Sequence, residues 1–239
     1  MTTSEVPATM RQRAAHLTTA GLSDALDRLG IVGQVAGVRP LGPSYSVCGP
    51  AFTVRYRAVE ALGETVGDYI DDVPPGSVVV IDNQGRTDCT VWGDILTEAA
   101  RGRRVVGTVI DGVCRDAGWS ERVGYPVYAL ANWMRTGKDR VTVEAVRVCV
   151  QVGGVTVESG DLVVGDRDGI VVLPASSLAE IVELAESIET TEGQIREAVW
   201  SGERLDAARE RLSYHLLQRH TGSGGIGLTS REQQWQRQT

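Results

Sequence analysis

Three charged residues follow an apolar run in the stretch VIDGVCRDAG, residues 109–118. Asp111 comes directly after the run, and Arg115 and Asp116 follow shortly afterwards. Arginine binds a carboxylate through a planar fork of N–H groups, and aspartate oxygens bind a hard cation. The pair therefore indicates a site for a small anion and a divalent metal ion, with a surface ion pair as the alternative. For Asp111 and Gly112, the preferred interpretation is a simple turn.

A second candidate for anion binding lies in QGRTDCTVWGDILTEAARG, residues 84–102. Glycines and polar residues predict a loop at its start, and apolar spacing then predicts a helix that ends at Gly102. The free N–H groups at the start of a helix favour an anion. The residues expected to bind a substrate carboxylate there are Trp92, Gly93, Asp94 and Ile95. Asp94 alone has an alternative explanation, because the helix dipole favours any acidic residue in a first turn.

The composition limits the chemistry available to such a site. Lys138 is the only lysine and lies in the turn-like stretch RTGKDR, so imine chemistry and attachment of pyridoxal phosphate are not expected. The three histidines, His16, His215 and His220, lie far from both stretches, which argues against a histidine-ligated zinc or iron. A metal here would be Mg²⁺ or Mn²⁺ on carboxylate and water oxygens.

Charge and cysteine content restrict the class of protein further. The net charge of −7 argues against nucleic acid as a partner. The four cysteines form no C-x-x-C pair, so they are expected to be buried small side chains rather than zinc or disulfide ligands. No apolar run is long enough to span a bilayer, and the first residues lack the apolar core of a signal peptide. We therefore expect a cytoplasmic protein with no membrane partner.

Hydrophobic periodicity predicts one α/β domain over residues 8–205 that positions these groups. Its first half is expected to begin with helical structure over 8–30 that ends at Gly30, and Ser23–Asp24 within this range are a candidate helix start. The elements expected next are a strand over 48–60, a short helix over 63–73, and strands over 77–83 and 103–112. The last two strands and the helix between them form a strand-loop-helix-strand unit. Ligands collect at the carboxyl ends of strands in such units.

The second half is expected to add strands and an amphipathic C-terminal helix over 176–200. The expected strands cover 125–130, 141–157 and a hairpin over 161–174, whose GDRDG tip is interpreted as a turn rather than a ligand site. Residues 206–239 are expected to form a helical and polar tail with a disordered end.

The spacing of the charged residues resembles a known signature. Asp94, twenty intervening residues, Arg115–Asp116, four more residues and Glu121 resemble the pattern of the metal-dependent pyruvate aldolases of the RraA-like superfamily. These are 4-hydroxy-4-methyl-2-oxoglutarate and 4-carboxy-4-hydroxy-2-oxoadipate aldolases. The flanking segments SDALDRLG, CGPAFTV, WGDILTEAA and GDLVVGDRDGIVVLP are also similar, so that the resemblance covers about residues 17–205.

The resemblance implies a role for each matching residue. Asp116 would be the direct ligand of Mg²⁺ or Mn²⁺, and Arg115 would stabilise the enolate oxygen of the pyruvoyl group. Asp94 would orient a water for proton transfer, and the amides of residues 92–95 would hold the substrate carboxylate. The candidates for further acidic groups near the metal are Glu121 and, from a neighbouring subunit's C-terminal helix, Glu189 or Glu192.

The same resemblance implies a swivelling β/β/α sandwich with a C-terminal helix, assembled as a homotrimer or homohexamer. The expected activity is retro-aldol cleavage of a small oxo-acid to pyruvate, with oxaloacetate decarboxylation as a side activity. Two alternatives stay open. One is a non-catalytic regulator of the RraA type that binds a ribonuclease or another protein, although that regulator lacks the aspartate after the arginine. The other is an aldolase or decarboxylase for a different oxo-acid.

Overall fold

The computed structural model describes residues 6–60 and 67–214. The end of the predicted tail, residues 215–239, lies outside the described residues, as does the start of the short helix predicted over 63–73. Within the described part of that segment, a 3₁₀ helix covers Asp68–Asp72. Among the helices of the described residues, none is both long enough and apolar enough to cross a membrane.

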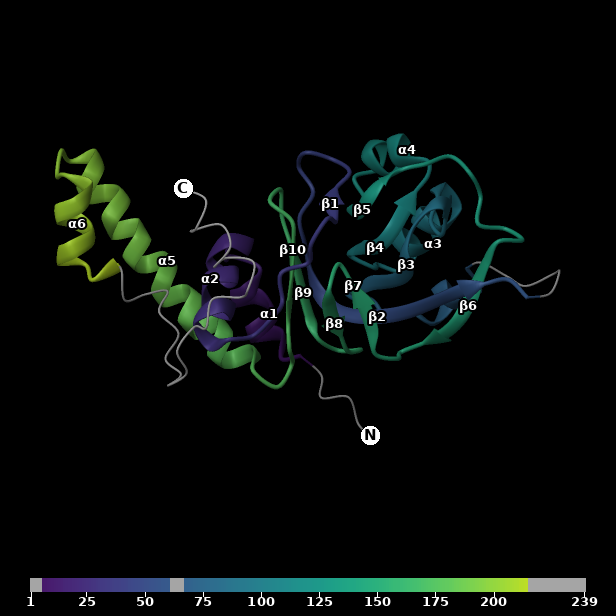
Figure 1. Cartoon of the computed structure of the whole chain (residues 1–239), viewed down its shortest axis with the longest axis horizontal. Coiled ribbons are helices and arrows are strands. Elements are labelled where there is room, and N and C mark those ends of the chain that lie inside the picture. The colour runs from purple at the N-terminus through teal and green to yellow at the C-terminus, as the bar shows by residue number, and fades with distance from the viewer. Residues whose placement is uncertain (1–5, 61–66, 215–239) are drawn as a thin grey trace, which may run out of the picture.

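A mixed sheet of eight strands forms the centre of the protein (Figure 1). Its strands are β1 (Arg39–Pro40), β2 (Val47–Ala58), β3 (Val78–Thr90), β4 (Gly107–Cys114), β5 (Val127–Asn132), β6 (Val141–Val146), β9 (Leu162–Gly165) and β10 (Ile170–Leu173). The order is β1-β5-β4-β3-β2-β9-β10, and β6 also pairs with β2. Neighbouring strands from β2 to β5 are parallel, so the predicted strand-loop-helix-strand unit is confirmed.

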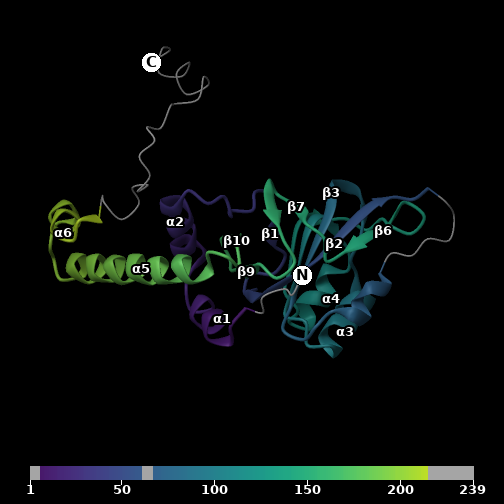
Figure 2. The same cartoon turned by 90° about the horizontal axis from the view of Figure 1, so that it is seen from below.

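Helices cover the sheet in two groups. Helices α3 (Asp94–Gly102) and α4 (Ala117–Arg122) lie together on one face of the parallel strands (Figure 2). Helices α1 (Ala8–Ala14), α2 (Thr19–Leu29) and α5 (Leu178–Trp200) gather beside β9 and β10. The far end of α5 extends away from the sheet, where α6 (Leu205–Arg211) folds back beside it (Figures 1 and 2). A separate hairpin consists of β7 (Val150–Val152) and β8 (Val155–Val157).

Alternation along the parallel strands divides the apolar core. Successive side chains of a strand point to opposite faces. Val79 and Ile81 of β3 accordingly belong to the cluster beneath α3 and α4, whereas Val78 and Val80 belong to the cluster that includes β7 and β8. The uninterrupted apolar run predicted over 77–83 is therefore a strand covered on both faces.

The N-terminal segment differs from the single helix expected over residues 8–30. Two helices form, because the side chain of Thr18 caps the second one by accepting the N–H of Gly21 at 3.0 Å. Ser23 and Asp24 lie inside α2, so the suggestion that they start a helix was wrong. Gly30 ends α2 in the left-handed conformation, with φ of 67°, as predicted.

The loop expected after residue 83 is mostly strand, and the turn expected at Asp111–Gly112 is absent. β3 continues to Thr90 with two register shifts, and Asp111 and Gly112 lie within β4, where Asp111 pairs with Asp82. Asp82 accepts N–H groups from Gln84 and Gln151, which stabilises its carboxylate at a buried position beside Asp111. The turn interpretation of Asp111 was therefore wrong.

The remaining elements largely confirm the sequence expectations. β9 and β10 form the expected hairpin, and α5 begins two residues after the predicted helix start at 176. The carboxylate of Asp166 at the hairpin tip accepts the N–H and the hydroxyl of Thr19 at 2.9 and 2.7 Å, so this turn anchors α2. All four cysteines are free thiols. Cys89 and Cys114 are buried as expected and Cys48 is half-buried, but Cys149 is exposed, so the expectation of burial was wrong for Cys149.

Candidate active site

The carboxyl end of β4 and the start of α3 meet at Asp116. This residue occupies the N-cap position of α4 in the left-handed conformation, with φ of 57° and ψ of 30°, and its side chain makes no capping hydrogen bond. Its Oδ2 lies 3.1 Å from Nε of Arg115 and accepts the backbone N–H of Asp94 at 3.3 Å. Sequence reasoning placed these three residues in one site, and the structure brings them into contact.

Gly93 fits between the charged groups because it has no side chain. A Cβ at this position would lie 2.8 Å from Oδ2 of Asp116 and 3.1 Å from Nε of Arg115. The φ of Gly93 is −159°, an extended conformation open to any residue, so the close approach of the two side chains, rather than the backbone conformation, favours glycine here. The carboxylate and the guanidinium thus lie against the backbone at the start of α3.

The N–H groups at the start of α3 already attract carboxylate oxygens. The N–H of Asp94 donates to Asp116, and the N–H of Ile95 donates to Oδ1 of Asp94 at 2.8 Å. These groups carry the positive end of the helix dipole. The arrangement supports the expectation that an anion binds here, although two of the four amides already have partners within the protein.

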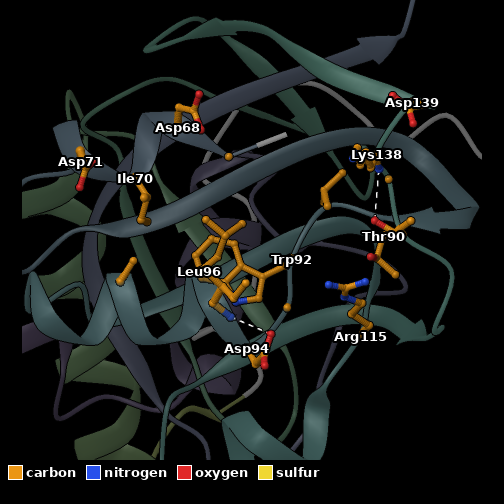
Figure 3. A pocket seen from close by; sticks show the side chains of 17 residues that line it. Asp68, Ile70, Asp71, Thr90, Trp92, Asp94, Leu96, Arg115, Lys138 and Asp139 are labelled. Atoms are coloured by element: carbon orange, nitrogen blue, oxygen red, sulfur yellow. Dashed lines mark hydrogen bonds between the residues drawn. The ribbon is translucent and has the colours of Figure 1, made fainter. Parts of the chain in front are cut away.

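A cavity of about 610 Å³ opens beside these groups. Residues 90–96, Arg115 and residues 136–139 line it, together with part of the 3₁₀ helix. Figure 3 shows Asp94 and Arg115 on neighbouring segments of the wall, with Lys138 and Asp139 beyond Thr90. The volume suits a small molecule rather than a polymer.

Two side chains of this region, Trp92 and Cys114, are buried, although Trp92 also contributes to the cavity lining. Trp92 is 2% exposed, and its ring stacks on Tyr125 with centroids 6.1 Å apart. Burial, with the nearby charge of Asp116, raises the pKa of Cys114 to about 12, so this thiol is uncharged at neutral pH. Cys114 is therefore a buried thiol rather than a thiolate nucleophile.

Lys138 is a cavity residue that the sequence did not indicate. Its stretch, RTGKDR, reads as a solvated turn, and Lys138 is indeed exposed. It nevertheless lines the same cavity as Arg115, because the parallel bridge between Thr90 and Thr136 brings this turn beside the end of β3. Only the strand pairing, which no local pattern encodes, could have revealed this placement.

The remaining acidic candidates lie elsewhere in the chain. Glu121 lines a separate cavity of about 260 Å³ with Tyr45, whose pKa is raised to about 12 by burial and by the charge of Glu121. On α5, Glu189 accepts the N–H and the hydroxyl of Thr18, each at 2.7 Å, whereas Glu192 pairs with Arg196 at 3.4 Å. Within one chain, the structure does not bring Glu121 into the cavity of Arg115.

A metal at Asp116 would need oxygen ligands from outside this single chain. Across residues 6–60 and 67–214, no three histidine, cysteine, aspartate or glutamate side chains are close enough together to hold an ion. Mg²⁺ commonly binds through one or two carboxylates and keeps several waters or substrate oxygens. The Asp116 carboxylate fits such an ion, whereas it does not fit zinc with three or four protein ligands.

Known proteins of similar sequence indicate the family of this chain. The chain is 37% identical over 214 residues to DlpA of Legionella pneumophila. The aligned region is 88% of this chain but only 35% of DlpA, so the chain spans about a third of that relative. It is 32% identical over 171 residues to a Halalkalibacterium halodurans protein provisionally named 4-hydroxy-4-methyl-2-oxoglutarate aldolase, covering 71% of this chain and 78% of that one.

Solved structures give the same result for the fold. An uncharacterized protein from Pseudomonas syringae pv. tomato superposes with a TM-score of 0.81 at 43% identity, over 86% of this chain and 99% of that one. RraAS2 of Streptomyces coelicolor, described as an unusual member of the RNase ES inhibitor RraA family, gives 0.71 at 30% identity, over 81% and 98%. The predicted α/β sandwich of the RraA type is confirmed. Since the RraA-like family pattern, described as Aldolase/RraA, matches residues 19–172, the chain belongs to the RraA-like family.

Proposed function

We propose that this chain is a lyase dependent on Mg²⁺ or Mn²⁺ that cleaves a 4-hydroxy-2-oxo acid to release pyruvate. Oxaloacetate decarboxylation is the expected side activity, because it forms the same enolate. The observation that carries the proposal is the contact of the Asp116 carboxylate with both Arg115 and the N–H of Asp94. It joins the Asp116 carboxylate to a guanidinium and a helix N-terminus, and Arg115 and Asp94 line a cavity of small-molecule size.

Asp116 would hold the metal ion, with water and substrate oxygens completing the coordination. When bound, the ion would supply Lewis-acid polarisation of the substrate's oxo group. The composition supports this choice, because the chain's single lysine lies exposed in a turn rather than at a buried position where its amine could be activated.

Arg115 binds the oxo oxygen of the pyruvoyl group in this proposal. As the C3–C4 bond breaks, its electron pair forms the C2=C3 bond of the enolate and the C2=O π pair moves onto the oxygen, where the guanidinium stabilises the developing charge. The C4 hydroxyl gives its proton to a water, and C3 of the enolate then gains a proton from the same water. Asp94, whose carboxylate is fixed by the N–H of Ile95, would orient that water.

The amides of residues 92–95 would bind the substrate carboxylate. Two of these amides now donate to the carboxylates of Asp116 and Asp94. A substrate carboxylate would take the place of such a side-chain carboxylate as the acceptor at the positive end of α3. Lys138 faces the same cavity and would attract negative charge at the far end of the substrate.

Assembly is part of this proposal. Among the residues that the structure describes, no three possible ligands gather at Asp116, and the far end of α5 extends away from the sheet (Figure 1). We propose a homotrimer or homohexamer in which α5 of a neighbour supplies an acidic residue. Glu192 suits this role better than Glu189, which already binds the start of α2. The cytoplasmic location expected from the sequence stays a prediction within this proposal.

The alternative function is a regulator that binds a ribonuclease without catalysis. The similarity to RraAS2 favours it, whereas the contact of Asp116 with Arg115, which lines the cavity, favours an enzyme. One experiment separates the two. Pyruvate release is measured from oxaloacetate, 4-hydroxy-4-methyl-2-oxoglutarate and 4-carboxy-4-hydroxy-2-oxoadipate, with EDTA, Mg²⁺ or Mn²⁺.

We expect turnover that EDTA abolishes and that either metal restores. Full activity in a metal-free sample would refute the metal-dependent reaction. No pyruvate from any of the three substrates with either metal, together with inhibition of a ribonuclease by the same sample, would establish the regulator instead.

A further inference from the structure

The hydroxyl of Thr97 is the centre of a buried network beneath the candidate site. It lies 3.0 Å from Nε1 of Trp92, 2.9 Å from the carbonyl oxygen of Gly93 and 3.2 Å from Oγ of Ser120. Thr97 and Ser120 are both 0% exposed. The three contacts use the whole hydrogen-bonding capacity of one hydroxyl, which is one donated and two accepted bonds.

The chemistry of the partners fixes the direction of each bond. The indole N–H of Trp92 can only donate, and the carbonyl of Gly93 can only accept. Thr97 therefore donates its single proton to Gly93 and accepts from Trp92, which leaves Ser120 as the donor of the third bond. Valine has a similar shape but satisfies none of the three partners, because it lacks the oxygen, whereas serine keeps the hydroxyl.

The hydrogen-bond partners of Thr97 belong to the two segments that form the candidate site, the start of α3 and α4. Trp92 and Gly93 precede α3, whereas Ser120 lies in α4, where its N–H donates to the carbonyl of Asp116 at 3.3 Å. On the cavity side, the same two segments touch through the N–H of Asp94 and the carboxylate of Asp116. The Thr97 hydroxyl is thus the buried counterpart of that exposed contact.

We propose that Thr97 is a positioning residue that sets the separation between the backbone of residues 92–94 and the carboxylate of Asp116. Its role in turnover rests on the proposed function, but its role in geometry does not. Gly93 leaves no spare space between the backbone and the charged pair, so a shift of α3 against α4 changes the approach of Asp116 directly.

The test compares Thr97→Val, which keeps the shape and removes the hydroxyl, with Thr97→Ser, which keeps the hydroxyl. Thr53→Val is the matched control: Thr53 is also 0% exposed, and its hydroxyl donates to the carbonyl of Val148, away from the site. Three measurements are made on each full-length protein: Mn²⁺ binding, kcat and KM for oxaloacetate decarboxylation, and hydrogen exchange of the amides of residues 92–95.

For Thr97→Val we expect Mn²⁺ affinity to fall by about tenfold or more, the scale seen when a supporting partner of a metal ligand is lost. We expect kcat to fall by about ten- to a hundredfold with a smaller change in KM, because misplacement by a fraction of an ångström acts on the reacting geometry. Amide exchange at Asp94 and Ile95 should accelerate. Thr97→Ser should restore all three quantities to near wild type, and Thr53→Val should leave them unchanged.

Thr97→Val with unchanged Mn²⁺ affinity and unchanged amide exchange would overturn the proposal. So would equal losses in Thr53→Val, since general destabilisation would then explain both. If the wild-type protein proves inactive, the proposed function fails, while metal binding and amide exchange still decide the role of Thr97. If Thr97→Val does not fold, Ser120→Ala removes one of the three bonds and should change exchange and Mn²⁺ binding in the same direction.

Discussion

The carboxylate of Asp116 accepts the backbone N–H of Asp94 at 3.3 Å, across 22 positions of the chain. The contact joins the start of α3 to the start of α4. It exists because the left-handed conformation of Asp116 turns the chain back toward Gly93 immediately after β4. A non-glycine residue pays a conformational cost in this region, and such residues concentrate at functional sites.

The closeness of Gly93 to the charged pair gives the first prediction. In Gly93→Ala, the new Cβ would lie 2.8 Å from Oδ2 of Asp116, so the carboxylate must move away. We expect Mn²⁺ affinity and kcat/KM to fall by about tenfold or more, as when a metal ligand loses its support. Isothermal titration and the decarboxylation assay measure the two quantities.

Gly118→Ala is the matched control, because a Cβ at Gly118 in α4 would meet nothing within 4 Å. Alanine is favoured over glycine in a helix by up to about 1 kcal/mol, so this variant should be slightly more stable and equally active. A Gly93→Ala protein with wild-type Mn²⁺ affinity would contradict the prediction.

The carboxylate of Asp111 predicts an unusual dependence of stability on pH. Burial and the charge of Asp82 raise the pKa of Asp111 above its ordinary value. The carboxyl group of Asp111 therefore stabilises the fold at pH values below its pKa in the unfolded chain, which is about 3.9. This stabilisation is lost as the pH rises through the pKa of Asp111 in the folded protein. Asp111→Asn should gain free energy of unfolding relative to wild type between about pH 4 and pH 7, measured by urea denaturation.

Asp88 provides a control of opposite sign, since its bond to Arg86 lowers the pKa of Asp88. The Asp88 carboxylate therefore stabilises the fold at pH values above its pKa in the unfolded chain, and this stabilisation is lost as the pH falls through its pKa in the folded protein. Asp88→Asn should accordingly lose stability relative to wild type as the pH rises. The same pH dependence in both variants would refute the assignment for Asp111.

Much of the fold follows from periodicity along the sequence. The apolar run of residues 77–83 and the helical spacing after Asp94 predict a parallel unit with a site at its carboxyl end, and β3, α3 and β4 form that unit. Gly30 and the hairpin at 166–169 were predicted from residue types whose conformational preferences are strong.

The errors occur where distant contacts overrule local preference. Asp111–Gly112 reads as a turn, yet the pairing with Asp82 and the N–H groups of neighbouring segments keep it in a strand. Lys138 enters the cavity only because its turn pairs beside Thr90. Neither contact involves residues close in sequence, so no window of the sequence could contain the information.

The position of Lys138 gives a prediction about covalent chemistry. Lys138 lines the cavity but lies exposed in a turn, whereas a lysine that forms an imine is activated by desolvation or by an adjacent cation. Incubation with pyruvate and borohydride should leave the mass of the protein unchanged in mass spectrometry. A reduced pyruvate adduct on Lys138 would replace the metal-dependent reaction with an imine mechanism.

The predicted assembly can be tested through Glu192. Light scattering should show a trimer or hexamer for the wild-type protein. Glu192→Gln should keep that assembly and lose activity, because it removes a charge that we place near a neighbour's metal, whereas Glu197→Gln on the same helix should keep both. An active monomer would remove the neighbour from the mechanism.

The last prediction separates the roles of Arg115 and Asp116. Asp116→Asn keeps the size of the side chain and tolerates the left-handed conformation, so the fold should survive, but the charge that would hold the metal is gone. Mn²⁺ binding and turnover should both collapse.

Arg115→Lys keeps a positive charge and loses the planar fork, and arginine and lysine are not interchangeable where two N–H groups act together. Metal binding should then survive, while kcat/KM for oxaloacetate falls by about a hundredfold or more, the scale of losing one oxyanion donor. If Arg115→Lys turns over oxaloacetate like the wild type, then Arg115 is only the ion-pair partner of Asp116, and the group that stabilises the enolate lies elsewhere in the cavity.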